Sequence, residues 1–150
     1  MNKIHKPDLV ILEGPDKAGK STIYQAFRKH THYQPLVIDR FIGSNIAYDQ
    51  LHKRADVMAT TAALYETEVK LKDIFNPLLV YLHAPVDVML ERSVRAGDIR
   101  EEEFDIRNIQ AYYERYMNNT TLPRIQIDTA IYTVEQIVEI IERNLSSWGE

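Results

Sequence analysis

Short apolar runs alternate along the chain with stretches in which apolar residues recur every three or four positions. The runs cover residues 9–13, 36–38, 78–82 and 125–127, and glycine, proline or charged residues bound them, as is typical of strands. The stretches between them have the period of amphipathic helices. Strands that alternate with helices predict a parallel sheet covered on both faces. We therefore predict an α/β fold with three layers (α/β/α) and four or five parallel strands.

Three details refine this pattern. Residues 44–75 have helical periodicity, and the small residues at 59–62 predict a break into two helices there. Tyr112, Tyr113 and Tyr116 recur at helical spacing, which favours a packing stripe over a base-stacking platform. Thr133 and Gln136 are spaced as a capping box and predict the start of the last helix.

Composition narrows the class of protein. The chain has 150 residues, of which 45% are hydrophobic and 27% charged, and we expect a single domain spanning residues 1–150. The absence of cysteine excludes disulfides and thiolate metal sites. The net charge of −4 disfavours a protein that coats nucleic acid. No apolar run approaches the roughly 20 residues of a membrane span, and the N-terminus lacks the pattern of a secretory signal. We therefore expect a cytoplasmic protein with no membrane partner.

One local motif carries most of the chemical information. Residues 14–22 match the P-loop pattern G-x-x-x-x-G-K-[ST], after a predicted strand and before a predicted helix. The predicted α/β fold is therefore of the P-loop NTPase type. Such a loop points backbone N–H groups at a triphosphate, and the start of the helix favours the same anion. Lys20 is expected to reach the β- and γ-phosphates of ATP, and the Ser21 hydroxyl to ligate Mg²⁺. The predicted ATP-binding residues are Gly14, Pro15, Asp16, Lys17, Ala18, Gly19, Lys20, Ser21 and Thr22.

The rest of the chain favours a kinase over a molecular switch or motor. An Asn-Lys-x-Asp segment that reads guanine is missing, and a chain of this length leaves little room for machinery that uses hydrolysis. A kinase needs an acceptor pocket and cations that close over the phosphates instead. Both are present as candidates in residues 39–48 and in the arginines after residue 90.

Residues 39–48, Asp-Arg-Phe-Ile-Gly-Ser-Asn-Ile-Ala-Tyr, follow the second predicted strand, so they should face the P-loop at the carboxyl edge of the sheet. Together with residues 13–22 they resemble the thymidylate kinases. Residues 90–97, followed by Glu103 and Phe104, look like the lid of that family, placed here at about 92–103. The likeness runs in order from residue 9 to about 145.

The resemblance implies a role for individual residues. Asp16 would lie near the acceptor sugar and the metal, and Asp39 would orient Mg²⁺ or act as a base. Arg40 would bind the acceptor phosphate, because a guanidinium binds such oxygens in bidentate fashion. The implied catalytic residues are Asp16, Lys20, Asp39, Arg40, Arg92 and Arg95, with Arg100 as a further lid arginine. The implied acceptor-binding residues are Asp16, Arg40, Phe41, Ser44, Asn45 and Tyr48, and the implied metal ligands are Ser21 and Asp39.

Purely structural interpretations stay open for several of these side chains. Asp39 and Arg40 are also consistent with a local ion pair at the end of a strand, and Tyr48 with a core position. The lid arginines lie beside acidic residues and are also consistent with a solvated surface of mixed charge.

The sequence departs from thymidylate kinases between Ser21 and Asp39, where it has room for one helix and one strand only. The extra strand and helical segment of the family, with an arginine and an aromatic side chain for the nucleotide, have no counterpart. The first hypothesis is a minimal kinase that phosphorylates a thymidine-like deoxynucleotide, of a size that suits a viral protein. The alternative is a kinase for a hydroxyl in DNA or RNA, at a 5′ end or on a modified base. A third hypothesis is a nucleotide-binding regulator without enzymatic activity. The resemblance also implies a homodimer through residues 44–75.

Overall fold

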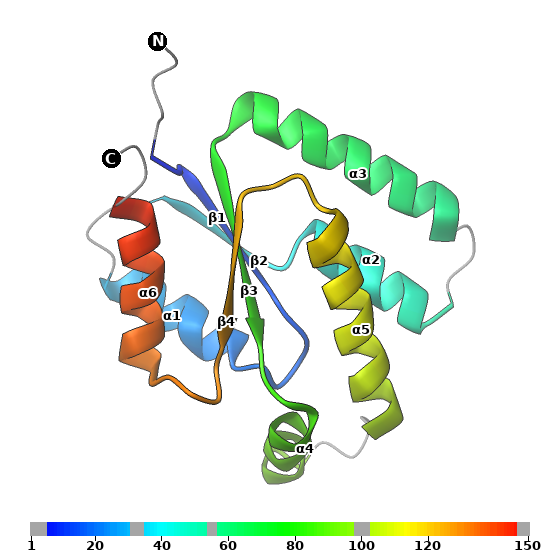
Figure 1. Cartoon of the computed structure of the whole chain (residues 1–150), viewed down its shortest axis with the longest axis vertical. Coiled ribbons are helices and arrows are strands. Elements are labelled where there is room, and N and C mark those ends of the chain that lie inside the picture. Colours follow the sequence, from blue (N-terminus) through cyan, green and yellow to red (C-terminus); the bar gives the residue numbers. More distant parts are fainter. Residues whose placement is uncertain (1–5, 31–34, 54–56, 98–102, 147–150) are drawn as a thin grey trace.

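A parallel four-stranded sheet forms the centre of the fold (Figure 1). The computed structural model describes residues 6–30, 35–53, 57–97 and 103–146. The strands are β1 (Leu9–Glu13), β2 (Leu36–Asp39), β3 (Pro77–His83) and β4 (Arg124–Asp128), in the spatial order β2-β1-β3-β4. Every neighbouring pair is parallel. The predicted α/β class and the parallel sheet of four strands are confirmed.

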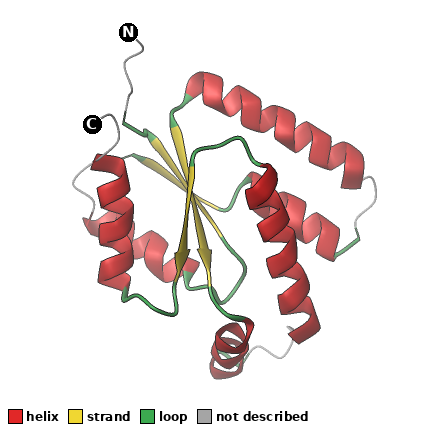
Figure 2. Ribbon diagram, viewed as in Figure 1, coloured by secondary structure: helices red, strands yellow, loops and turns green. Residues whose placement is uncertain are grey.

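Helices cover both faces of this sheet (Figure 2). One face carries α1 (Lys20–His30) and α6 (Val134–Ser146), and the other carries α2 (Ile42–Leu51), α3 (Val57–Ile74) and α5 (Glu103–Asn119). The remaining helix, α4 (Val86–Arg95), follows β3 beyond the carboxyl edge of the sheet. This arrangement gives the three predicted layers. Of the helices in the part of the chain that the structure describes, none is long and apolar enough to cross a membrane.

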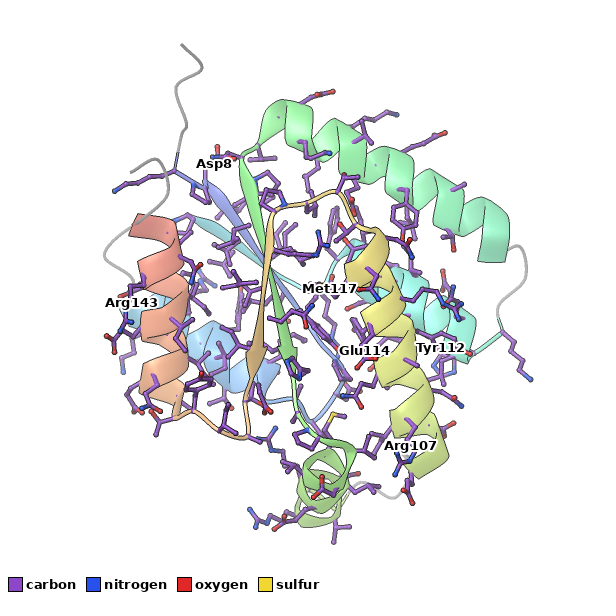
Figure 3. The ribbon with its side chains drawn as sticks, in the orientation of Figure 1. Asp8, Arg107, Tyr112, Glu114, Met117 and Arg143 are labelled. Atoms are coloured by element: carbon purple, nitrogen blue, oxygen red, sulfur yellow. The ribbon has the colours of Figure 1, made fainter. Side chains whose placement is uncertain are left out.

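The hydrophobic core lies on the two faces of the central strands. β1 is buried throughout and β3 almost throughout, whereas β2 and β4 at the edges are only partly covered. Central strands of a parallel sheet are covered on both faces, which explains their continuous apolar runs. Tyr113 and Tyr116 are buried in the core, so the predicted packing stripe is confirmed. Both tyrosines belong to α5, on which Met117 is also buried, whereas Arg107, which pairs with Glu103, is exposed (Figure 3).

The break in the helical stretch 44–75 lies earlier than its predicted position. α2 ends at Leu51, and α3 continues without interruption through residues 59–62. The prediction of two helices is right, but its boundary is wrong. Residues 59–62 are two alanines and two threonines, and they do not end a helix because alanine is the best helix former and threonine is tolerated. Lys53 adopts a left-handed conformation with φ of +50°, which a helix cannot continue through.

The predicted capping box is present at the start of α6. The backbone N–H of Gln136 donates to the Thr133 hydroxyl at 3.1 Å, and the backbone N–H of Thr133 donates to Oε1 of Gln136 at 2.9 Å. Two otherwise unpaired donors are thereby satisfied. The helix that begins there packs against α1 on the same face of the sheet.

The strand order places a topological switch point, where a crevice can form, between β1 and β3. From β1 the chain first crosses to β2 on one side and then returns to β3 on the other. In open α/β sheets, ligands bind outside the carboxyl ends of the strands at such a reversal. The loop that follows β1 at this point is the predicted P-loop.

Candidate nucleotide-binding site

The P-loop can turn tightly after β1 because glycine stands at two positions where a side chain would clash or strain the backbone. A Cβ atom on Gly14 would lie 2.2 Å from the carbonyl oxygen of Leu82 on β3, so a side chain does not fit there. Gly19 has φ of +87°, a left-handed conformation that glycine adopts without strain. The chain then enters α1 at Lys20.

A cavity of about 260 Å³ lies over this loop. It is lined by Pro15, Asp16, Lys17, Gly19, Lys20, Ser21, Thr22 and Arg40. Of the predicted ATP-binding residues, Gly14 and Ala18 do not line it, because Gly14 abuts β3 and Ala18 is fully buried. The first N–H groups of α1 have no acceptor within the helix, and together with the helix dipole they favour a bound anion.

Lys20 and Asp39 lie in direct contact at the floor of the site. The Lys20 side chain is only 5% exposed, and its Nζ donates to Oδ1 of Asp39 at 2.6 Å. The structure thus joins the end of β2 to the P-loop, as the sequence predicts. A buried ammonium needs an anionic partner, and Asp39 provides one.

Arg40 forms a second link between the same two loops. Its guanidinium pairs with the carboxylate of Asp16 and lies over the ring of Tyr48, 5.5 Å from the ring centroid. Arg40 has φ of +67°, a left-handed conformation that costs free energy for any residue with a Cβ atom. The pair forms across the two loops, so the local Asp39–Arg40 ion pair that the sequence left open is not what the structure has.

A second cavity, of about 350 Å³, lies on the side that the sequence predicts to bind the acceptor, called the acceptor side below. It is lined by Arg40, Phe41, Ser44, Asn45 and Tyr48, which are the predicted acceptor-binding residues other than Asp16. Arg40 lines both cavities. Tyr48 also packs edge-on against Tyr113 of the core, so its cavity-lining and core interpretations both hold.

Glu13, to which the sequence analysis assigned no role, is buried beneath the residues that line the second cavity. Its fully buried carboxylate accepts hydrogen bonds from the backbone N–H of Phe41 and, at 2.6 Å, from the Ser44 hydroxyl. That hydroxyl lies 2.7 Å from the hydroxyl of Tyr113. Burial raises the pKa of Glu13 from 4.5 to about 7, against the opposing effect of these hydrogen bonds and of Lys20. A carboxylate at the end of a fully apolar strand was the available signal.

The predicted lid arginines differ in their positions. Arg92 on α4 donates to the carbonyl oxygen of Lys17 at 2.8 Å and to the Thr129 hydroxyl at 3.1 Å, so it contacts the P-loop backbone. Arg95 is 74% exposed and pairs with Glu91 on its own helix, as in the solvated-surface interpretation. Arg100 and residues 98–102 of the predicted lid lie outside the described residues.

The donors around the first cavity fit Mg²⁺ bound together with a nucleotide. Mg²⁺ is usually held by one or two carboxylates, a hydroxyl and substrate phosphates, and it seldom has an all-protein cage. Ser21 and Asp16 line the cavity. The Asp39 carboxylate contacts Lys20, which lines the same cavity. Within the described ranges, no cluster of three or more acidic or histidine side chains forms a separate metal site.

The fold and this site together define the class of protein. Solved structures with the same fold include deoxyadenosine kinase from M. mycoides with bound dCTP, with a TM-score of 0.68 and 17% identity, covering 93% of this chain and 99% of that one. They also include thymidylate kinase from Candida albicans, with a TM-score of 0.61 and 12% identity, covering 95% and 92%. The chain therefore has the fold of P-loop nucleoside and nucleotide kinases.

A relative in sequence defines the family. The SPbeta prophage-derived uncharacterized protein YorR of Bacillus subtilis (strain 168) is 30% identical over 125 residues, which cover 83% of this chain and 74% of YorR. The crystal structure of YorR in complex with phosphorylated GDP superposes with a TM-score of 0.70 and 26% identity, covering 89% of this chain and 92% of that one. The chain belongs to the family of YorR. No protein-family model matches the sequence.

Proposed function

We propose that this protein is a kinase that transfers the γ-phosphate of ATP, bound with Mg²⁺ in the P-loop, to a thymidine-like deoxynucleotide. The observation that carries the proposal is the position of Arg40, which lines both the P-loop cavity and the neighbouring cavity on α2. A side chain shared by two cavities is suited to hold an acceptor against the phosphate that is to be transferred. The relatives support the same class of activity.

In the proposed reaction, a phosphate oxygen of the acceptor attacks the γ-phosphorus, the bond from that phosphorus to the β,γ-bridging oxygen breaks, and ADP leaves. The P-loop N–H groups and Lys20 hold the donor, so Lys20 exchanges Asp39 for phosphate oxygens. Arg40 likewise exchanges Asp16 for the acceptor phosphate. Bound Mg²⁺, held by Ser21 and by Asp39, would neutralise charge on the donor phosphates.

The acceptor side is assigned by its lining. Asn45 is proposed to bind the base edge, and Tyr48 to pack against the sugar; both line the second cavity. Arg92 was expected to close over the phosphates, but its contacts with the P-loop backbone do not support that role. Arg95 and Arg100 remain the candidates for closing the lid.

The relatives bear on the choice of substrates. The M. mycoides enzyme is a deoxyadenosine kinase and was solved with dCTP, the Candida enzyme is a thymidylate kinase, and YorR was solved with phosphorylated GDP. Bound molecules of this size favour a small nucleoside or nucleotide acceptor over a polynucleotide.

We also propose a homodimer through α3, which exposes the apolar side chains of Val69 and Ile74.

The test is phosphate transfer from ATP labelled at the γ-position, with Mg²⁺, to a panel of acceptors. The panel contains thymidine, thymidylate, the other deoxynucleosides and their monophosphates, and DNA with free 5′-hydroxyls. Label in thymidine diphosphate is the expected result. Arg40→Ala should then raise the KM for the monophosphate far more than the KM for ATP, because the guanidinium is the acceptor's anchor.

Other outcomes would change the proposal. Label in a nucleoside monophosphate would make the acceptor a hydroxyl, and label only in DNA would restore the polynucleotide hypothesis. Tight ATP binding without transfer to any acceptor would favour the regulator hypothesis instead.

A further inference from the structure

Two side chains from outside the P-loop hold its backbone carbonyl groups. The Thr129 hydroxyl, just after β4, donates to the carbonyl oxygen of Ala18 at 2.6 Å. The guanidinium of Arg92, on α4, donates to the carbonyl oxygen of Lys17 at 2.8 Å. Arg92 also donates to the Thr129 hydroxyl at 3.1 Å, which links the two contacts into one network.

This network is anchored to the sheet. The backbone N–H of Thr129 donates to the carbonyl oxygen of His83, the last residue of β3, at 2.8 Å. Thr129 is buried and Arg92 is half-buried, so neither side chain is free to leave its position without opening the structure around it. The P-loop is therefore supported by the ends of two strands and by α4.

The geometry of the peptide unit gives these contacts a direction. In a trans peptide the carbonyl oxygen and the following N–H point to opposite sides. Because Thr129 binds the carbonyl of Ala18, the N–H of Gly19 points away from Thr129. Gly19 lines the P-loop cavity, and a Cβ atom there would lie 3.9 Å from both Arg92 Nη1 and the Thr129 hydroxyl. The two side chains thus contact the outer side of the loop, opposite the cavity.

We propose that Arg92 and Thr129 are positioning residues that orient the P-loop peptides, so that the Gly19 N–H faces the donor phosphates. This inference rests on the proposed nucleotide donor and deepens it. It assigns Arg92 a role in preparing the donor site before any lid closes. An amide held in position beforehand does not have to be reoriented when the anion binds, and so binding is stronger.

The first test compares Thr129→Val with Thr129→Ser. Valine keeps the branched shape but removes the hydroxyl, whereas serine keeps the hydroxyl. We expect Thr129→Val to weaken ATP binding roughly tenfold by calorimetry, in line with the loss of one or two hydrogen bonds. Thr129→Ser should bind ATP like the wild type. The KM for the acceptor should not change in either variant, because neither Thr129 nor Arg92 lines the acceptor cavity.

The second test concerns Arg92. Arg92→Ala should weaken ATP binding at least as much as Thr129→Val, and the double variant should show less than the sum of the two effects because they share one network. Arg143→Ala, which removes an exposed arginine paired on α6, is the matched control and should leave ATP binding unchanged. If Arg92→Ala binds ATP normally but loses turnover, Arg92 closes over the phosphates as the sequence predicted, and the proposal is wrong.

A readout without nucleotide separates this inference from the proposed function. The backbone amide resonance of Gly19 should shift in Thr129→Val and return toward the wild-type position in Thr129→Ser. An unchanged Gly19 resonance in Thr129→Val would overturn the positioning role even if the protein proves to be a kinase. A shifted resonance in a protein that phosphorylates no acceptor would keep the positioning role and reject the kinase.

Discussion

The donor and acceptor sides of the site are built from different material. The donor cavity lies over a loop whose binding groups are mainly backbone N–H groups at the start of α1. The acceptor cavity is lined by side chains from the end of β2 and from α2, and Glu13 braces them from beneath. A backbone site follows from a short local motif, whereas a side-chain site depends on partners far along the chain. Glu13 and Phe41, which are 28 positions apart in the sequence, illustrate that dependence.

The two sides nevertheless share their charges. Lys20 of the donor side is held by Asp39 at the end of β2, and Asp16 of the P-loop holds Arg40 of the acceptor side. Each of these two cations is therefore paired with a carboxylate from the opposite loop. In the proposed reaction, binding on one side would release a carboxylate on the other, which would link the two halves of the site through ion pairs.

The largest expected effect comes from the donor side. Lys20→Ala should lower kcat about 100-fold or more, because Lys20 is the buried cation placed for the transferring phosphate. Steady-state phosphate transfer measures this loss, and circular dichroism should show that the fold is kept. Lys29→Ala, on the exposed face of the same helix, is the matched control and should be fully active. Near-normal turnover of Lys20→Ala would show that the donor phosphates do not bind at the P-loop.

An intermediate effect is expected from Glu13, which supports the acceptor side. Its pKa is about 7 in the folded protein and about 4.5 in the unfolded chain, so the folded protein binds the extra proton between these values. Its contribution to stability is therefore complete below about pH 4.5 and is lost as the pH rises through about 7. Over that window the free energy of unfolding should fall by about 3 kcal/mol relative to Glu13→Gln, which cannot titrate.

Urea denaturation of both proteins between pH 4.5 and 8 measures this difference, since all other titrating groups are common to the two. A constant difference across the window would mean that Glu13 keeps an ordinary pKa. The carboxylate would then be accessible to water, and the acceptor side would lack its buried brace.

The sequence predicted most of the fold because the fold depends on repeating local patterns. The apolar runs of β1 and β3 and the helical periods between them were enough for a parallel three-layer structure. The break between α2 and α3 was misplaced, because it depends on the left-handed conformation of one residue, Lys53. Composition of a segment does not reveal such a conformation when the residue is not glycine.

Prediction of the site succeeded where the chain itself fixes the geometry. The P-loop motif located Lys20 and Ser21, and the strand-end rule placed Asp39 beside them. The position of Arg92 was not predictable in this way, because a long side chain has several reachable partners and the carbonyl groups it binds come from residue 17 and beyond β4. Glu13 was missed for the same reason, since its partners, the Phe41 N–H and the Ser44 hydroxyl, lie at the start of α2, far along the chain.

The smallest expected effect tests whether the acceptor side is held under backbone strain. Arg40→Gly and Arg40→Ala both remove the guanidinium, with its contacts to Asp16 and Tyr48. Only glycine also relieves the left-handed conformation at φ of +67°, so Arg40→Gly should be about 1 kcal/mol more stable than Arg40→Ala. Both should show the same defect toward the acceptor, and urea denaturation resolves the difference in stability.

The same pair of substitutions at Asn45 provides a control of opposite sign. Asn45 lies inside α2, where the backbone is right-handed, so Asn45→Gly should be less stable than Asn45→Ala by roughly 1 kcal/mol. If glycine were the less stable choice at Arg40 as well, the end of β2 would be unstrained there. The Arg40 guanidinium would then keep its position between the two cavities without tertiary contacts, such as those of Glu13, that hold a strained backbone in place. The predicted reversal of sign between residues five apart therefore tests whether tertiary contacts, rather than local preference, set the acceptor side.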